Sequence, residues 1–243
     1  MAATPRALRF FDRATLVEAA AERLIARLIE LQDHPGTPQL GLSGDPLAYD
    51  VLAAAVERMP NSPVDPTRLS LWWTFDAFVP TDSTQRHALR MLSLLAGRVQ
   101  LDPAIVHPIP SSDAYADPEA AAHQYAQDLG QTRLDICLLE LGSRGQVAGL
   151  FPGQRPPPSS EPVVGLTDAP HGPPERVSLS LAALNASREI WLLAAGQAVA
   201  GLVAASWAGA SNLPSAHLAG RERTWWFLDQ AAAGLLPFHR CTL

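Results

Sequence analysis

Short, continuous runs of apolar residues alternate with amphipathic stretches along most of this chain, and this alternation limits the fold more than any other feature. The runs 39–44 (QLGLSG), 69–75 (LSLWWTF) and 134–141 (LDICLLEL) have the length of strands and contain few polar side chains. Strands that are buried on both faces and separated by helices are typical of parallel sheets covered by helices. The pattern therefore predicts an α/β fold with a mostly parallel, doubly wound sheet flanked by helices.

Helical periodicity predicts that several segments between these strands are helices. Apolar residues recur at helical spacing from residue 15 onward: Leu16, Ala20, Leu24, Leu28 and Leu31. Thr15 and Glu18 form a candidate capping box at the start of this helix. Further helices are expected over 46–58, 84–96, 118–129 and about 197–207, and further strands over 176–184, 188–196 and 224–229. We expect a single domain over residues 1–243, in which the proline-rich segment 152–164 is a surface loop or a boundary.

In doubly wound sheets, ligands bind in the loops that follow the carboxyl ends of the strands. The loops in which we expect functional residues are therefore 43–46, 74–84, 142–151 and 196–200. Ser83 and Thr84 lie where the next helix should begin, and we interpret them as helix-capping residues.

Composition excludes several classes of function. All 18 basic residues are arginines, so no lysine is present to form a Schiff base, hold a phosphate or act as a general base. The net charge of −6 comes without clustered basic and aromatic residues, so we expect no nucleic-acid partner. The first residues lack the apolar core of a signal peptide, and no run reaches membrane-spanning length. We therefore expect a cytoplasmic protein with no membrane partner.

Metal-binding patterns are also absent from the sequence. Cys137 and Cys241 belong to no CxxC motif. One histidine, His171, lies in a candidate functional loop considered below. The other histidines show no metal spacing, and we interpret them as surface or helix-end residues: His34, His87, His107, His123, His217 and His239. We expect neither a metal site nor a cofactor.

Four segments resemble, in order, motifs of the 6-phosphogluconolactonase family, which belongs to the same superfamily as the glucosamine-6-phosphate deaminases. The strongest is 141–153 (LGSRGQVAGLFPG), which is similar to the family pattern Leu-Gly-x-Asp-Gly-His-x-Ala-Ser-Leu-Phe-Pro. The other segments are 168–196, 72–89 and, near the C-terminus, 213–218 with 225–232. The resemblance implies the family's α/β fold. It also implies hydrolysis of 6-phosphogluconolactone to 6-phosphogluconate in the pentose phosphate pathway, without metal or cofactor.

The same resemblance implies that residues at the family's reactive positions are replaced by others in this chain. The family's aspartate falls on Arg144, its catalytic histidine on Gln146 and its serine on Gly149. A glutamine donates and accepts hydrogen bonds but does not take up a proton as a base, and arginine stays charged at working pH. By resemblance, this is a lactonase-type protein with a degenerate active site.

Other family positions are altered as well. The acidic Asp-Glu-Arg loop retains one carboxylate, Asp76, and the glycine loop is shortened to 44–46 (GDP), which makes it a poor cradle for phosphate. The family's two lysines fall on His171 and Val199, while its arginine is retained as Arg176. The expected substrate-binding positions are Gly44, Asp45, Arg144, Gly145 and Arg176.

Three positions are candidates for the chemistry itself: Gln146, Asp76 and His171. His171 is either a displaced base or a solvated loop histidine. Arg144 either converges with Arg176 on an anion such as a phosphate, or forms an ion pair with Asp45 or Asp76.

Two functions follow from these alternatives. The chain is either a lactonase that works with substituted groups, or a non-catalytic homologue that binds a sugar phosphate or a partner enzyme of the same pathway. A deaminase activity is a third hypothesis.

Overall fold

The computed structural model, which describes residues 4–153 and 161–237, is built around a seven-stranded sheet with the order β1-β10-β9-β6-β2-β3-β5. All neighbouring strands in this sheet run parallel, which confirms the predicted fold class. The strands are β1 (Arg6–Phe10), β2 (Gln39–Leu42), β3 (Ser70–Trp73), β5 (Val106–His107), β6 (Ile136–Glu140), β9 (Glu189–Ala194) and β10 (Arg223–Asp229).

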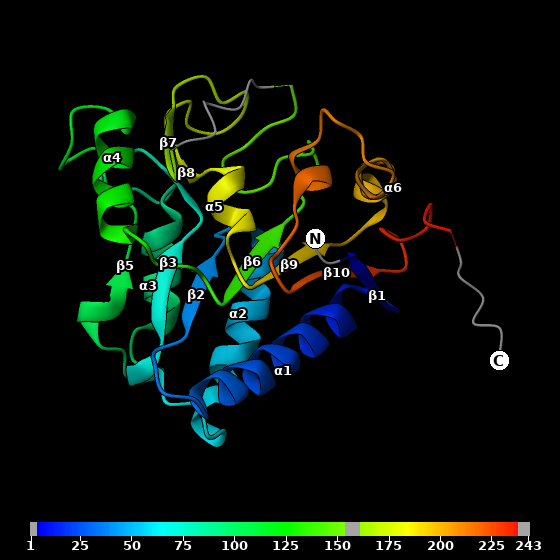
Figure 1. Ribbon diagram of the computed structural model, residues 1–243, viewed down its shortest axis with the longest axis horizontal. Coiled ribbons are helices and arrows are strands. Elements are labelled where there is room, and N and C mark those ends of the chain that lie inside the picture. Colours follow the sequence, from blue (N-terminus) through cyan, green and yellow to red (C-terminus); the bar gives the residue numbers. More distant parts are fainter. Residues whose placement is uncertain (1–3, 154–160, 238–243) are drawn as a thin grey trace.

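Helices lie on both sides of this sheet (Figure 1). They are α1 (Arg13–Gln32), α2 (Pro46–Arg58), α3 (His87–Leu95), α4 (Pro118–Leu129), α5 (Leu181–Asn185) and α6 (Ala200–Trp207). Short 3-10 turns are η1 (Met59–Asn61), η2 (Pro66–Arg68), η3 (Pro103–Ile105), η4 (Gln197–Val199) and η5 (Pro214–His217). Helices α1 and α2 pack on each other and against β10 and β6, along the lower side of the view, whereas α4, α5 and α6 lie above.

Helix α1 confirms the predicted apolar stripe, but its cap differs from the prediction. All five apolar residues that the spacing singled out are buried. The capping box joins Asp12 and Thr15: the backbone N–H of Thr15 donates to Oδ1 of Asp12 (2.8 Å), and that of Asp12 donates to Oγ1 of Thr15 (3.0 Å). Glu18 instead pairs with Arg58 on α2. The predicted Thr15–Glu18 box is wrong because the helix starts at Arg13, which makes Thr15 the third helical residue.

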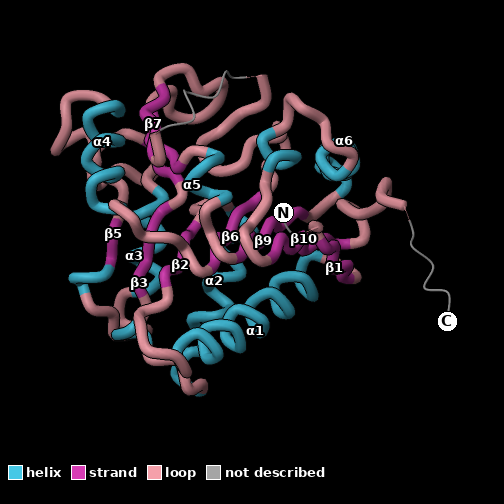
Figure 2. Tube along the Cα trace, in the orientation of Figure 1, coloured by secondary structure: helices cyan, strands magenta, loops and turns pink. Residues whose placement is uncertain are grey.

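A second, three-stranded antiparallel sheet was not foreseen from the sequence. It has the order β4-β8-β7, with β4 (Phe75–Ala77), β7 (Val163–Leu166) and β8 (Arg176–Leu179). In Figure 2, β7 lies beside α4 in the upper left. The strand predicted over 176–184 ends at Leu179, because Ser180 caps α5 by accepting from the backbone N–H of Ala183 (3.2 Å). Most of the proline-rich segment 152–164 lies outside the described residues.

Helix α3 begins three residues later than expected. Its first backbone N–H groups, those of His87 and Ala88, donate to the carboxylate of Asp76 at 2.8 and 3.0 Å. Ser83 and Thr84 are therefore not its caps. A sequence pattern favours a local capping residue, but here an acceptor eleven residues upstream is brought to the helix start by β4.

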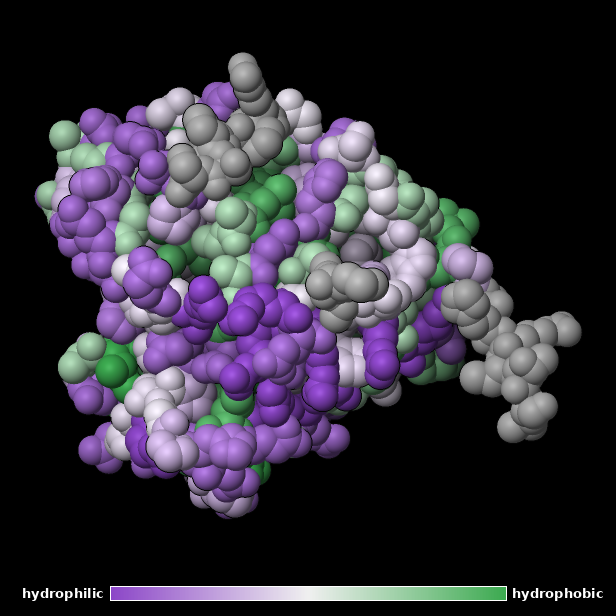
Figure 3. Space-filling view, viewed as in Figure 1, coloured by the Kyte–Doolittle hydropathy of each residue, from purple (hydrophilic) through white to green (hydrophobic). Residues whose placement is uncertain are grey.

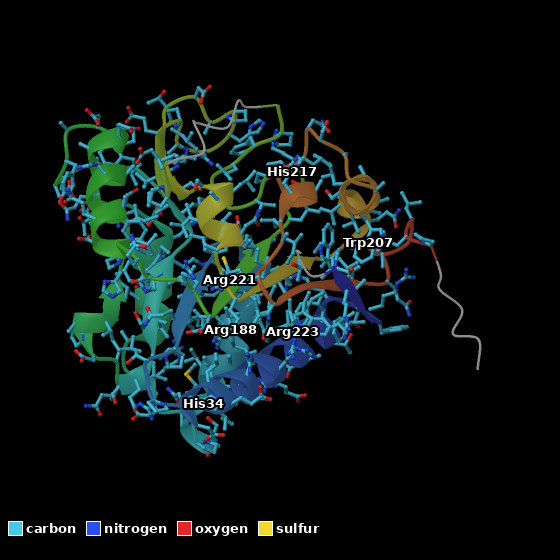
Figure 4. The ribbon with its side chains drawn as sticks, in the orientation of Figure 1. His34, Arg188, Trp207, His217, Arg221 and Arg223 are labelled. Carbon is cyan, nitrogen blue, oxygen red and sulfur yellow. The ribbon has the colours of Figure 1, made fainter. Side chains whose placement is uncertain are left out.

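The amino ends of β9 and β10 carry a group of charged residues: Arg188, Glu189, Arg221, Glu222 and Arg223. Figure 3 shows a strongly hydrophilic area in the middle of this face of the molecule. Figure 4 shows Arg188, Arg221 and Arg223 there, just above α1. Arg188 pairs with Asp135 (3.3 Å) and with Glu222 (3.1 Å). This group lies at the end of the sheet opposite to the carboxyl ends. None of the described helices is long and apolar enough to cross a membrane.

Candidate functional site

A pocket of about 200 Å³ opens beside the carboxyl ends of β2 and β6, where ligands of parallel sheets are expected. Three of the four predicted loops contribute to it, while loop 196–200 does not line it. The lining residues from the β2, β4 and α3 region are Asp45, Phe75, Ala77, Gln85 and His87. Those from the loop after β6 and from the β7–β8 connection are Arg144, Gln146, Ala148, Phe151, His171, Gly172, Pro173 and Arg176.

Arg144 and Arg176 are brought together by the segment around His171. Nη1 of Arg144 donates to Nε2 of His171, and Nη2 of Arg176 donates to the backbone oxygens of His171 (2.6 Å) and Pro173 (3.0 Å). Arg144 and His171 are exposed at the rim, whereas Arg176 is buried with its guanidinium 4.9 Å from the ring centre of Phe151. The two arginines therefore flank one side of the pocket.

The alternative ion pairs of Arg144 are not formed within the described residues, since neither Asp45 nor Asp76 contacts its guanidinium. Partial desolvation, and then the charge of Arg144, lower the pKa of His171. A neutral imidazole suits the acceptor role of Nε2 towards Arg144. The same bond occupies the nitrogen that a displaced base would need.

Gln146 fixes the loop that follows β6. Its Oε1 accepts from the backbone N–H of Arg144 (3.1 Å), and its amide folds over Gly142, where an added Cβ would lie 1.8 Å from Nε2. Gly145 has a φ of +79°, a conformation that favours glycine, and it does not line the pocket. Gly149 donates its backbone N–H to Oγ of Ser178 (3.1 Å). The glycines thus shape the loop, while Gln146 faces the ligand space.

Asp45, on the loop after β2, and His87, the first residue of α3, line one part of the pocket. The ring of His87 packs on Gly44 so closely that a Cβ there would lie 2.1 Å from Cγ, and it meets Phe75 edge to face at 4.6 Å. The sequence predicts a surface or helix-end position for His87. It is a helix-end residue that lines the pocket, and its position after a strand and loop was the available signal.

Burial raises the pKa of Asp45. The charge of His87, a hydrogen bond from Ser43 and the charge of Arg176 lower it by less, so the pKa of this carboxyl group is raised overall. Burial likewise lowers the pKa of Arg176, and Asp45 opposes this shift. Asp45 and Arg176 thus stabilise each other's charged forms inside the pocket.

Asp76, a predicted catalytic position, lies behind the pocket rather than in its lining. The side chain is fully buried and accepts from the backbone N–H groups of Ala77, His87 and Ala88 at 2.8, 2.8 and 3.0 Å. Nε of Arg86 is 3.7 Å away. Asp76 therefore stabilises the start of α3 and fixes the backbone of His87.

Glu140, at the end of β6, was missed by sequence analysis. Its Oε2 accepts from the backbone N–H groups of Leu47 (2.6 Å) and Ala48 (3.3 Å) at the start of α2. Burial, and then the neighbouring Asp45, raise the pKa of Glu140 to about 7. A single carboxylate at the end of an otherwise apolar strand was the only signal in the sequence. The amino end of α2, a natural site for an anion, is occupied by the protein's own carboxylate.

No group of three or more His, Cys, Asp or Glu side chains in the described part of the chain is arranged to hold a metal ion.

Comparison with known proteins gives the following matches. Residues 11–226 match the family model described as glucosamine-6-phosphate isomerases/6-phosphogluconolactonase. The 6-phosphogluconolactonase of Streptomyces coelicolor is 37% identical over 252 residues, which cover 98% of this chain and 97% of the relative. That of Mycobacterium tuberculosis is 32% identical over 241 residues, covering 94% and 97%.

Solved structures show the same fold. The 6-phosphogluconolactonase from Trypanosoma cruzi superposes with a TM-score of 0.86 at 18% identity, covering 98% of this chain and 99% of that one. A monomeric glucosamine-6-phosphate deaminase gives 0.78 at 17% identity, covering 95% and 99%. Because both activities occur on this fold, the fold alone does not choose between them.

Proposed function

Because the chain belongs to the glucosamine-6-phosphate isomerase/6-phosphogluconolactonase family, we propose that it hydrolyses the lactone of a phosphorylated sugar acid, with 6-phosphogluconolactone as the first candidate substrate. The lactonase name of relatives with 37% and 32% identity over nearly the full length supports this choice over a deaminase. The main support for the proposal is that Arg144 and Arg176 line one pocket, which also holds histidine and carboxylate side chains.

The phosphate end of the substrate fits beside Arg144 and Arg176. Two guanidinium groups bind a phosphate through paired, charge-assisted hydrogen bonds. His171 keeps both arginines in place, through Nε2 for Arg144 and the backbone oxygen for Arg176. In this proposal His171 is a positioning residue for the phosphate site.

The carbonyl oxygen of the lactone needs a hydrogen-bond donor as it becomes an oxyanion. Gln146 has a suitable group, because its Oε1 is held by the backbone N–H of Arg144 and its Nε2 stays available to donate. The residue at the family's base position would thus serve as an oxyanion donor, and the base must come from elsewhere in the pocket.

The test is the rate of 6-phosphogluconolactone hydrolysis by the pure protein after subtraction of the spontaneous rate. We expect activity above background, and for both Arg144→Ala and Arg176→Ala a KM raised by about tenfold or more, since each change removes a charged hydrogen-bond donor. Arg221→Ala is the matched control, because Arg221 is exposed at the opposite end of the sheet (Figure 4).

A rate equal to background in folded protein would contradict the proposal. In that case, binding of 6-phosphogluconate measured by calorimetry decides whether the pocket serves a non-catalytic homologue that binds sugar phosphates. Binding that Arg144→Ala and Arg176→Ala weaken would establish that role.

A further inference from the structure

We propose that His87 is the general base of this pocket and accepts the proton of the water molecule that attacks the lactone. The inference rests on the lactone hydrolysis proposed above. It identifies the general base of that reaction, a role that Gln146 does not fill. Among the residues that line the pocket, the side chains that can act as a proton acceptor are Asp45, His87 and His171.

Two of these three side chains already form hydrogen bonds with other residues. Nε2 of His171 accepts from Arg144 at the exposed rim. The Oδ2 atom of Asp45 accepts from the hydroxyl of Ser43, and its charge interacts with Arg176. His87 differs, because no hydrogen bond occupies either of its ring nitrogens within the described part of the chain.

The two ring nitrogens of His87 lie in different surroundings. Nδ1 is buried without a partner, on the side where the ring packs against Gly44. Nε2 is not among the buried unpaired atoms of the described residues, and the side chain lines the pocket. In the proposed mechanism this nitrogen faces the ligand space. A solvent-accessible ring nitrogen on a residue of the pocket wall is what a general base requires.

The position of the ring is fixed in advance by three neighbours. Asp76 accepts from the backbone N–H of His87 (2.8 Å), Phe75 meets the ring edge to face, and Gly44 leaves the space that any Cβ would fill. This explains why a glycine precedes Asp45 in a loop that is otherwise a poor phosphate cradle. Such restraint lowers the entropic cost of placing the base against a bound water.

The pocket that contains His87 also holds acidic and basic side chains. Asp45, on the loop after β2, attracts the imidazolium ion, and Glu140 of β6 is a neighbour of Asp45. The lining of the same pocket also includes Arg144, His171 and Arg176. The carboxylate of Asp45 is thus the group that stabilises the charge formed on His87 during the reaction.

The reaction balances without any further reactant. The water oxygen bonds to the lactone carbonyl carbon while one water proton passes to Nε2 of His87. The bond between that carbon and the ring oxygen then breaks, its electron pair stays on the ring oxygen, and the proton on His87 moves to this oxygen to give a hydroxyl group. The new carboxylic acid loses its proton to solvent, and His87 is neutral again.

The test compares His87→Ala with the unchanged protein in the hydrolysis of 6-phosphogluconolactone. We expect kcat to fall by about 10² to 10⁴, the usual contribution of a general base. Added imidazole should restore part of this loss, because the substitution leaves a hole of matching shape beside Gly44. Affinity for 6-phosphogluconate should stay within about threefold. His123→Ala, on the exposed face of α4, is the histidine control and should leave the rate unchanged.

Three outcomes would overturn the assignment while leaving the lactonase proposal intact. These are a full rate in His87→Ala, a loss of rate accompanied by loss of 6-phosphogluconate binding and no rescue by imidazole, or rescue by imidazole of His171→Ala instead. Absence of activity in the unchanged protein would overturn both proposals together.

Discussion

Helices α2 and α3 both begin next to the pocket, and both have their first backbone N–H groups bonded to a carboxylate from another part of the chain. Glu140 accepts from Leu47 and Ala48 of α2, and Asp76 accepts from His87 and Ala88 of α3. The geometry is similar, since in each case an acidic side chain at or near a strand end reaches a helix amino end.

The electrostatic surroundings of the two carboxylates differ. Asp76 has Nε of Arg86 at 3.7 Å, and both side chains are buried. Glu140 has the carboxylate of Asp45 as a neighbour, and Arg13 is only the last of the influences on its pKa. At α3, the charge of the capping carboxylate, Asp76, is compensated by Arg86. At α2, ionisation of the capping residue Glu140 costs free energy, because its side chain is buried and lies near Asp45.

The largest effect is expected for Asp76→Ala. This change removes the acceptor of three backbone N–H groups and leaves Arg86 buried without its counter-charge, so the free energy of unfolding should fall by about 3–5 kcal/mol. Urea denaturation at neutral pH measures it. Asp117→Ala is the control, because Asp117 is an exposed cap of α4 whose removal should cost about 1 kcal/mol. Equal losses in the two variants would mean that Asp76 is no more than a local cap.

A smaller effect of opposite sign is expected for Glu140→Gln. The folded protein raises the pKa of Glu140 from 4.5 to about 7, so the stability associated with its neutral form is present below pH 4.5 and is lost as the pH rises through 7. Glutamine keeps an acceptor for Leu47 and Ala48 but has no charge to lose. At pH 8 we expect the variant to be about 2 kcal/mol more stable than the unchanged protein, and at pH 4 nearly equal.

The measurement for Glu140 is the free energy of unfolding at a series of pH values. Other titrating groups are shared by the two proteins and largely cancel in the difference. Glu119→Gln is the matched control, since Glu119 is an exposed acidic residue in the first turn of α4 and should change stability by less than about 0.5 kcal/mol at any pH. A pH-independent difference for Glu140→Gln would contradict the raised pKa.

The smallest expected effect concerns ligand affinity. Ionised Glu140 adds negative charge next to Asp45, so its removal should tighten binding of 6-phosphogluconate at pH 8 by about fivefold, which corresponds to about 1 kcal/mol of Coulomb energy. At pH 5, where Glu140 is protonated in the folded protein, the two proteins should bind alike. Calorimetry at both pH values provides the comparison, and weaker binding by the variant at pH 8 would show that Glu140 supports the pocket instead of repelling the ligand.

Much of the fold could be predicted from the sequence, because periodicity is a local property. Helices 46–58 and 118–129 agree with the structure at both ends, and the central apolar strand 134–141 forms β6 within those bounds. Strand β8 forms the first part of the predicted strand 176–184, but its antiparallel pairing with β4 and β7 was missed, as were the edge strands β1 and β5. The missed strands are short, and they depend on partners far away in the chain.

For the site, the sequence by itself determined which residues are available: no lysine, a glutamine at 146, and arginines at 144 and 176. It also placed the pocket at the carboxyl ends of the strands. Only the tertiary structure decided that Asp76 faces the start of α3 and that Glu140 occupies the start of α2. It also decided that Nε2 of His171 is bonded to Arg144, whereas Nδ1 of His87 has no hydrogen-bond partner among the described residues. The reason is physical: a side chain's role depends on which backbone N–H groups, charges and rings surround it, and packing of distant segments brings these together.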